Sequence, residues 1–382
     1  MTDKPAKATA SRILLSLASL VVVIAGLQAA QSLILPILLA FFIASASFPI
    51  TRFLRRIRIP RSIAVLLTVM IDFGFLVGIG FLVNYLVVDL QAMVDVKYQA
   101  QFDTKWNDTT IWIREHWGDE AAGELSSKVK EYFNQERLSA IIKNVLGVSY
   151  NVISSTFIIL ILLIFMLSEA RMFQRRLTAI FEARGPDFQR MVTASRDIQR
   201  YLGIKTLISL STGILAWGLC ELVGLDFGPL WGILAFFLNY IPAIGSIVAG
   251  VPPVLLAVLM HDWKVGLFTA LGYLAINGFL GNFLEPMLLG RRFGLSTLVI
   301  LISVIFWGWL WGPLGMLLAV PLTMILKVGL DNNPELRWLS IAMSKEKQIR
   351  PSEARILEQA GRSSEESKVV PEEVAEPSAL EG

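Results

Sequence analysis

The stretch from Gly228 to Met260 constrains the fold of this chain more than any other. It holds 33 residues without a charged side chain, yet helix-breaking residues interrupt it at Pro242, Gly245, Gly250, Pro252 and Pro253. A straight α-helix of this length would measure roughly 50 Å, against about 30 Å for the hydrocarbon core of a bilayer. Two full crossings would need roughly 40 apolar residues and a turn. We therefore predict a broken or re-entrant element, whose irregular backbone must be shielded by protein or by a water-filled cavity.

The composition indicates that the chain lies in a membrane. Of the 382 residues, 54% are hydrophobic and only 17% are charged, whereas soluble domains carry about 25% charged residues. The charges gather in a few clusters between long apolar runs, which predicts an all-α, polytopic integral membrane protein with about eight hydrophobic segments. The single cysteine, Cys220, excludes an intramolecular disulfide, and the two histidines, His116 and His261, lie far apart. We predict no metal site and no cofactor.

Basic clusters set the expected path of the N-terminal part. Residues 1–12 form a short basic cytoplasmic N-terminus, and an apolar block over 13–50 ends in five arginines between Arg52 and Arg61. Because basic residues flank the block on both sides, the positive-inside rule predicts a two-helix hairpin that turns near Gln28–Ser32. A cleaved signal peptide in its first half is the alternative. A third span over 62–88 then leads outward and completes the N-terminal region, 13–88.

The next segments alternate between the two sides of the membrane. Residues 89–143 carry ten acidic and seven basic residues and are predicted to be external. This segment contains three tryptophans, Trp106, Trp112 and Trp117. They either form the small core of an external helical subdomain, which we favour, or lie at the level of the lipid headgroups. Residues 144–168 cross back. The segment 169–205 has eight basic and four acidic residues, so we place it in the cytoplasm, attracted to anionic lipids rather than to nucleic acid.

The transport core is predicted over 206–327, as two units that each join a simple span to an overlong apolar run. The first unit covers 206–260. The second covers 265–327, where the run 293–326 is interrupted at Gly312–Pro313, Gly315 and Pro321. If the first run dips into the membrane and returns, the span 265–284 leads inward, and Arg291 and Arg292 become cytoplasmic as the charge rule requires. Residues 328–382 form a cytoplasmic tail, expected to be disordered beyond about residue 345.

The two overlong runs share a sequence pattern. Asp226-Phe227-Gly228 opens the first and Arg292-Phe293-Gly294 opens the second. Further on, residues 244–252 read IGSIVAGVP and residues 314–321 read LGMLLAVP, the same pattern less one glycine. Chance similarity among common membrane residues is the alternative. We favour an inverted repeat, because interrupted apolar segments at corresponding positions of two halves mark a transporter's binding site.

The chemistry expected along this path is binding rather than catalysis. The sequence has no phosphate-binding loop, nucleophile elbow or metal-spaced His/Glu cluster, so we predict no enzyme activity. The predicted substrate path consists of polar and helix-breaking residues of the two runs and the span between them: Asn239, Tyr240, Pro242, Gly245, Ser246, Asn277, Asn282, Glu285, Pro286, Gly312, Pro313 and Gly315. Three carboxylates are candidates for ion coupling: Asp72, Glu221 and Glu285. The alternative is that Asp72 is neutral or hydrogen-bonded and that the two glutamates are solvated residues at the membrane interface.

Two groups of motifs resemble a known family. Residues 239–245, NYIPAIG, followed by Pro252, resemble the signature of the autoinducer-2 exporter (AI-2E) family of PerM-like bacterial permeases. Later matches are Glu285-Pro286, Leu289-Gly290-Arg291, Gly294-Leu295, Trp307-Gly308, Trp311-Gly312, Gly315 and Ala319-Val320-Pro321-Leu322. The resemblance spans residues 12–330. It implies an integral membrane transporter of about eight hydrophobic segments, in a family associated with autoinducer-2 export, some members of which resemble sodium or proton antiporters. Leu295-Ser296-Thr297 departs from the pattern, since relatives often carry His or Pro there.

We therefore expect a secondary transporter of the bacterial cytoplasmic membrane that exports a small polar solute, such as an autoinducer-2-like signal. Both termini are expected in the cytoplasm. A monovalent cation/proton antiporter is the first alternative, and a non-transporting scaffold acting through 89–143 and 169–205 is the second. The expected partners are membrane lipids and a small solute or ion, with no nucleic acid. Self-association is left open.

Overall fold

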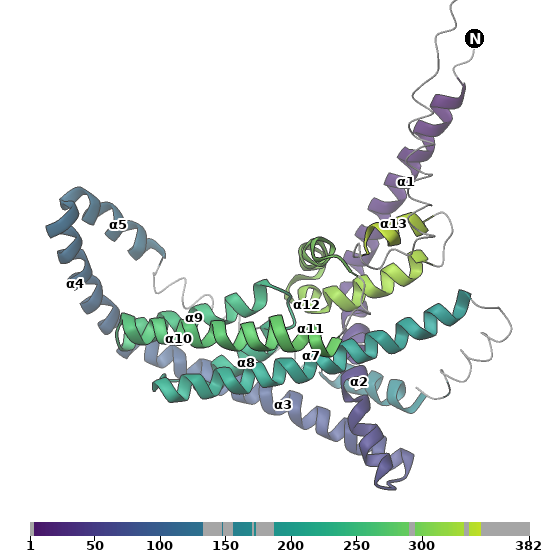
Figure 1. The fold of residues 1–382 in the computed structure, drawn as a ribbon, viewed down its shortest axis with the longest axis horizontal. Coiled ribbons are helices and arrows are strands. Elements are labelled where there is room, and N and C mark those ends of the chain that lie inside the picture. The colour runs from purple at the N-terminus through teal and green to yellow at the C-terminus, as the bar shows by residue number, and fades with distance from the viewer. Residues whose placement is uncertain are drawn as a thin grey trace, which may run out of the picture.

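The computed structural model of the chain consists of long helices, several of which lie side by side while the two N-terminal helices run steeply across them (Figure 1). It describes residues 4–132, 156–169, 187–289, 295–331 and 336–344, together with the single positions Gly147 and Met172. The described part contains no strand, only one isolated bridge between Leu295 and Ser344. Five of its helices are long and apolar enough to cross a membrane, and four shorter apolar helices accompany them. The expectation of a polytopic helical membrane protein is confirmed.

The N-terminal hairpin expected near Gln28–Ser32 is wrong. Helices α1 (Lys4–Ala29) and α2 (Gln31–Arg56) are separated by one residue, and α1 continues into α2 without turning back (Figure 1). Helical hydrogen bonds run through the junction, because the amide of Ala30 donates to the carbonyl of Gly26, and that of Ile34 to the carbonyl of Ala30. A helical hairpin needs a loop of about two to five residues. Helix α1 therefore extends α2 and does not turn back along it.

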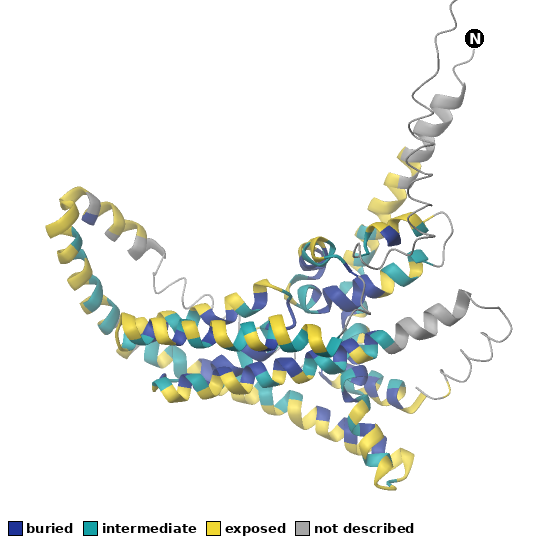
Figure 2. Ribbon diagram, viewed as in Figure 1, coloured by how far each residue is buried: buried dark blue, intermediate teal, exposed yellow. Residues whose placement is uncertain are grey.

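The segment between the third and fourth spans is an extended arm. Helix α3 (Arg61–Met93) continues through the π-helix η1 (Val94–Tyr98) into α4 (Gln99–Trp117), and α5 (Asp119–Tyr132) follows. The outer faces of α4 and α5 are exposed (Figure 2). The side chains of Trp112 and Trp117 are 54% and 75% exposed. The predicted tryptophan core of an external subdomain is therefore wrong, because these indoles pack against too little protein.

Helices α7 (Asp187–Val223) and α8 (Gly228–Leu238) pack closely against each other. Their backbones approach at two glycines: a Cβ placed on Gly213 would lie 2.7 Å from the carbonyl oxygen of Gly232, and one on Gly232 would lie 2.8 Å from that of Gly213. Such small-residue contacts are how membrane helices approach closely without a hydrophobic driving force. The predicted boundary at 205/206 falls inside α7, which runs unbroken from Asp187 to Val223 across both predicted segments.

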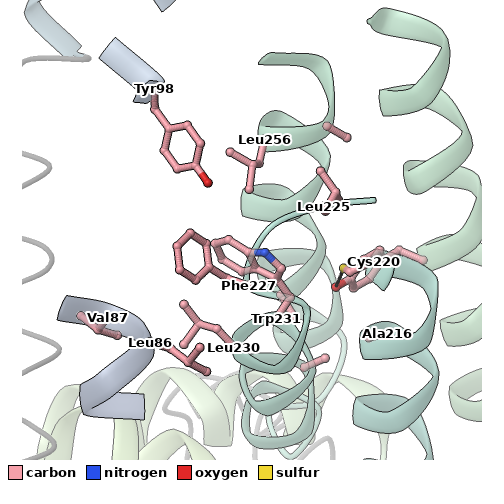
Figure 3. Close-up of a cluster of buried hydrophobic side chains, with 14 residues drawn as sticks. Leu86, Val87, Tyr98, Ala216, Cys220, Leu225, Phe227, Leu230, Trp231 and Leu256 are labelled. Atoms are coloured by element: carbon pink, nitrogen blue, oxygen red, sulfur yellow. Dashed lines mark hydrogen bonds between the residues drawn. The ribbon is translucent and has the colours of Figure 1, made fainter. Parts of the chain in front are cut away.

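A buried apolar cluster fixes α8 against its neighbours (Figure 3). Trp231 and Leu230 of α8 lie beside Leu86 of α3, and Cys220 of α7 and Leu256 complete the same cluster. Cys220 is buried and free. This cluster links the arm, α7 and the first overlong run in one packed body.

The second half of the core begins with a long composite helix. Helix α10 (Trp263–Asn277) continues through the π-helix η2 (Gly278–Leu284) into α11 (Glu285–Leu289). Helix α12 (Thr297–Asp331) follows and changes direction at its middle, and α13 (Arg337–Ala342) packs back against it (Figure 1). The helix Thr156–Glu169 represents the predicted fourth span. The arginine pair at 291 and 292 and the tail from 345 onward lie outside the described residues.

Candidate functional site

The first overlong run is two short helices joined by a break. Helix α8 has 11 residues and α9 (Ile244–Met260) has 17, which is about 16 and 26 Å, each shorter than the roughly 30 Å hydrocarbon core. Residues 239–243 connect them, and Ala243 adopts the left-handed region with φ 61°. The prolines at 252 and 253 lie inside α9, so the break is narrower than the sequence predicts. Pro253 is buried there, which shows that it packs within the helix rather than ending it.

The second overlong run breaks in the same way. The backbone leaves the helix at Trp311 and Gly312, where Gly312 has φ 66°. A Cβ on Gly245, just after the first break, would lie 1.7 Å from the carbonyl oxygen of Leu238. A Cβ on Gly315, just after the second, would lie 1.9 Å from that of Trp307. The two breaks thus share a glycine packed against a backbone carbonyl, although the first is five residues long and the second only two, and this common feature agrees with the predicted repeat.

Both ends of the first broken unit contact the same stretch of chain, residues 97–105. Before α8, the carboxylate of Asp226 accepts a hydrogen bond from Lys97 Nζ at 2.8 Å and another from the hydroxyl of Tyr98 at 3.1 Å. After α9, Lys105 Nζ donates to the carbonyl oxygens of Val258 and His261 at 2.8 and 2.6 Å. Lys97 and Lys105 are eight residues apart, about 12 Å along a helix. The two ends of this unit are therefore tied to one continuous helical stretch.

The contacts of Asp226 make this attachment electrostatic. The hydrogen bond from Lys97 lowers the pKa of Asp226, and the Tyr98 hydroxyl adds to the effect. Burial, together with the nearby Asp226 carboxylate, raises the pKa of Tyr98. A lowered carboxyl pKa means that the contact is present above the ordinary pKa of aspartate and is lost as the pH falls through the lowered value. The ion pair therefore persists at every pH near neutrality.

The beginning of the second broken unit is also held by residues from another part of the chain. The amide of Ser296, just before α12, donates to the carbonyl of Met343 at 3.0 Å. Leu295 forms the isolated bridge with Ser344. The start of this unit is therefore joined to the residues that follow α13. Buried apolar contacts join the two breaks, because Ile241 belongs to the same cluster as Trp307 and Trp311.

A chain of neutral polar groups crosses the first break. Asn239 Nδ2 donates to Ser209 Oγ of α7 at 3.0 Å, and Asn239 Oδ1 accepts from Ser246 Oγ of α9 at 3.2 Å. The backbone oxygen of Ser246 accepts a longer contact from Asn277 Nδ2 at 3.5 Å. Ser209 is fully buried and Asn239 is 5% exposed. The residues Asn239, Ser246 and Asn277, predicted from sequence, are thus brought together, and Ser209 is a member that sequence reasoning missed.

The same face of α7 carries a buried ion pair. Lys205 Nζ contacts both carboxylate oxygens of Glu285, at 2.9 and 2.8 Å, and the two side chains are 5% and 16% exposed. One residue further along α7, Thr206 Oγ1 accepts a hydrogen bond from the hydroxyl of Tyr240 at 2.8 Å. The ion pair therefore lies one helical turn from Ser209. Charge counting assigns Lys205 to the basic cytoplasmic segment, so its partner is visible only in the structure.

The other predicted path residues lie elsewhere. The side chains of Asn282 and Pro286 are exposed on η2 and α11, outside the polar chain described above. Pro313 is exposed, and tryptophan and leucine side chains pack around the second break, where Trp311 Nε1 donates to the carbonyl of Leu27 at 3.1 Å. Glu221 is exposed near the end of α7, where it accepts a hydrogen bond from Trp217 Nε1 at 2.9 Å. Asp72 is buried between α2 and α3 and belongs to neither break.

Two broken helices in a helical body with apolar outer faces, the first of them packed around buried polar groups, are features of membrane transporters. The chain belongs to the AI-2E family of transporters, whose family model matches residues 17–335. This confirms the family indicated by its motifs.

The relatives agree with the class. A candidate transport protein of Haemophilus influenzae is 35% identical over 85% of this chain and 93% of its own length. The AI-2 transport protein TqsA of Escherichia coli is 33% identical over 87% of this chain and 95% of its own. The candidate transport protein YhhT of the same species is 30% identical, over 86% and 93%. The protein is therefore a multi-pass membrane transport protein, and the transporter prediction is confirmed over the scaffold alternative.

Proposed function

We propose that this protein exports a small polar solute across the bacterial cytoplasmic membrane along the first break, between α7, the α8–α9 connection and α10. The observation that carries the proposal is the buried chain of hydrogen bonds through Ser209, Asn239 and Ser246. Buried polar groups inside a membrane protein are costly unless they are paired, and they mark substrate pathways. Unwound backbone near such groups frees carbonyl and amide groups to bind a solute.

We place both broken units as re-entrant hairpins that approach from opposite sides. The arginines between 52 and 61 lie in the cytoplasm, so α3 leads outward and the stretch 97–105 is external. The contacts of Lys97 and Lys105 with both ends of the first unit support its entry from outside. The second unit then enters from the cytoplasm, where the C-terminal tail lies.

Cysteine labelling tests this topology. In a Cys220→Ala background, we expect Lys264→Cys to react with an impermeant maleimide added outside intact cells, and Arg291→Cys to react only after permeabilisation. Lys264 is exposed in the first turn of α10, and this choice leaves the capping carboxylate of Asp262 intact. A single crossing by the first unit would exchange the two results and would contradict the hairpin.

The polar chain favours an uncharged, hydroxyl-bearing solute. Amide and hydroxyl groups both donate and accept hydrogen bonds, so they match a solute with several hydroxyl or carbonyl oxygens. The name of the relative TqsA identifies AI-2 as its cargo. We propose an autoinducer-2-like molecule for this chain, moved outward along its own gradient or an ion gradient. Such transport requires no covalent step and no bound cofactor.

Replacing Asn239 by alanine tests the path. We expect uptake of autoinducer-2 into inside-out vesicles to fall roughly tenfold or more, because Ser209 and Ser246 lose their shared partner. Asn84→Ala is the matched control, since Asn84 is an exposed asparagine on the membrane helix α3. Equal transport by the two variants, at equal expression, would contradict a path through the first break.

A second candidate function, monovalent cation/proton antiport, is favoured by the buried Lys205–Glu285 pair. A cation that reaches this site could compete with the Lys205 ammonium for the carboxylate. Sodium-driven proton movement in the same vesicles would identify this activity. Its loss in Glu285→Gln, with autoinducer-2 transport absent in the parent protein, would establish antiport in place of solute export.

A further inference from the structure

Asp72 is a buried carboxyl group with no cation beside it in the part of the chain that the structure describes. It lies 11 residues after Arg61, the first residue of α3, which is roughly 16 Å along the helix. Its side chain is 7% exposed. One oxygen, Oδ1, accepts a hydrogen bond of 2.6 Å from Ser47 Oγ of α2. The other oxygen, Oδ2, is fully buried and has no hydrogen-bond partner among the described residues.

The surroundings of Asp72 offer no compensating charge in the described residues. Charged residues on α2 occur only at its C-terminal end, after Thr51, and those on α3 besides Asp72 are Arg61 and Asp89 near its two ends. The helix Thr156–Glu169 carries only its terminal Glu169, and Lys205 of α7 is held by Glu285. An ionised carboxylate at such a position would cost several kcal/mol or more. A neutral carboxyl group is far less costly.

A proton fits this site, whereas a metal cation does not. Hard cations require about six oxygen ligands. Here the Ser47 hydroxyl donates its hydrogen to Asp72, so its hydrogen points toward the site. The next pair of hydroxyls, Thr51 and Thr68, is already joined by a hydrogen bond of 2.9 Å, and Thr68 also donates to the carbonyl of Ala64. The unpartnered oxygen Oδ2 is the atom left to carry a proton.

We propose that Asp72 binds a proton in this conformation and is the proton site that couples solute export to the proton gradient. This inference rests on the proposed transport function. Ser47 and Thr51 lie four residues apart on α2, and Thr68 and Asp72 lie four apart on α3. The Thr51–Thr68 hydrogen bond is therefore one helical turn from the Ser47–Asp72 hydrogen bond. From Asp72, the Thr51–Thr68 hydrogen bond lies in the direction of the arginine-rich cytoplasmic ends of α2 and α3. When that end opens, the proton leaves Oδ2 for water, and the carboxylate remains held by Ser47.

Reaction with dicyclohexylcarbodiimide tests proton binding without any transport assay. The reagent adds to a protonated, apolar-shielded carboxyl group: the acid proton passes to nitrogen, a carboxyl oxygen bonds to the carbodiimide carbon, and rearrangement gives a stable N-acylurea. The full-length protein in lipid nanodiscs is labelled at about pH 6 and at about pH 9, and the adduct on Asp72 is quantified by mass spectrometry. We expect about fivefold or more adduct at the lower pH. Asp72→Asn must lack it. Ser47→Ala should retain labelling at higher pH, because the carboxylate loses its hydrogen-bond donor. Labelling absent at every pH, or unchanged between the two pH values, would overturn the proposal.

Transport measurements separate this proposal from the proposed function. With radiolabelled autoinducer-2 as the probe, we expect Asp72→Asn to retain solute exchange at equal pH and to lose its stimulation by a pH gradient. Stimulation that survives in this variant, or that is absent from the parent protein, would overturn proton coupling at Asp72. Absence of exchange from the parent protein would overturn solute export instead, and the labelling result would stand apart from it.

Discussion

Replacing Lys205 by methionine is expected to destabilise the protein by about 3–5 kcal/mol, because Glu285 would be left as an uncompensated charge in the interior. Glu285→Leu should cost a similar amount by stranding the ammonium. In the double variant Lys205→Met/Glu285→Leu, no buried charge remains, and apolar replacements of an ion pair are often neutral or stabilising. We expect the double variant to recover thermal stability in detergent and yet to transport poorly.

The double variant distinguishes a structural pair from a working one. If it recovers both stability and transport, the ion pair serves only to position α7 against α11. Lys128→Ala provides the comparison, since Lys128 and Glu124 form a salt bridge of 2.6 Å whose side chains are 62% and 69% exposed. We expect no measurable change in the unfolding temperature of that variant, because exposed pairs are screened by solvent.

Adding one methyl group at either break is the second change with a large expected effect. In Gly245→Ala the new Cβ would meet the carbonyl of Leu238, and in Gly315→Ala that of Trp307, at 1.7 and 1.9 Å. Both obstacles are backbone atoms, so no side-chain rotation relieves them. We expect each variant to lose about 3 kcal/mol or more, the upper range for overpacking. The loss should appear as a lower unfolding temperature and little folded protein.

Gly329→Ala is the matched control for these two variants. It lies on α12 with Gly315, and a Cβ at Gly329 would meet nothing within 4 Å. Alanine is favoured over glycine in a helix interior by roughly 0.5–1 kcal/mol, so this variant should be neutral or slightly more stable. A mild effect at Gly245 with a severe one at Gly315, or the reverse, would contradict equivalent breaks.

The first break and its polar residues were predictable because local signals mark them. Pro242 and Gly245 interrupt a run that is otherwise too long for one span, and Asn239 and Ser246 flank the interruption. In an apolar environment, such polar residues must find one another, since no water competes for their hydrogen bonds. The structure joins Asn239 and Ser246 directly.

What sequence reasoning missed depends on contacts between distant residues. Lys205 and Glu285 are 80 positions apart, and counting charges by segment conceals a lysine that faces inward. The reversal predicted near Gln28–Ser32 followed from the charge rule, although that stretch contains no glycine or proline to end a helix. The prolines of α9 mark no break, because neighbouring membrane helices can satisfy the backbone groups that proline frees.

Because both ends of the first hairpin are attached to the stretch 97–105, a ligand that binds this stretch from outside can act on the pathway. Lys97 and Lys105 hold Asp226 and the end of α9 from outside the hairpin itself. A rigid antibody fragment bound to the exposed surface of α4 would restrain this stretch, and through it the hairpin. In the orientation proposed here, such a binder could arrest the transporter from the outer side without entering the cell or competing with the solute.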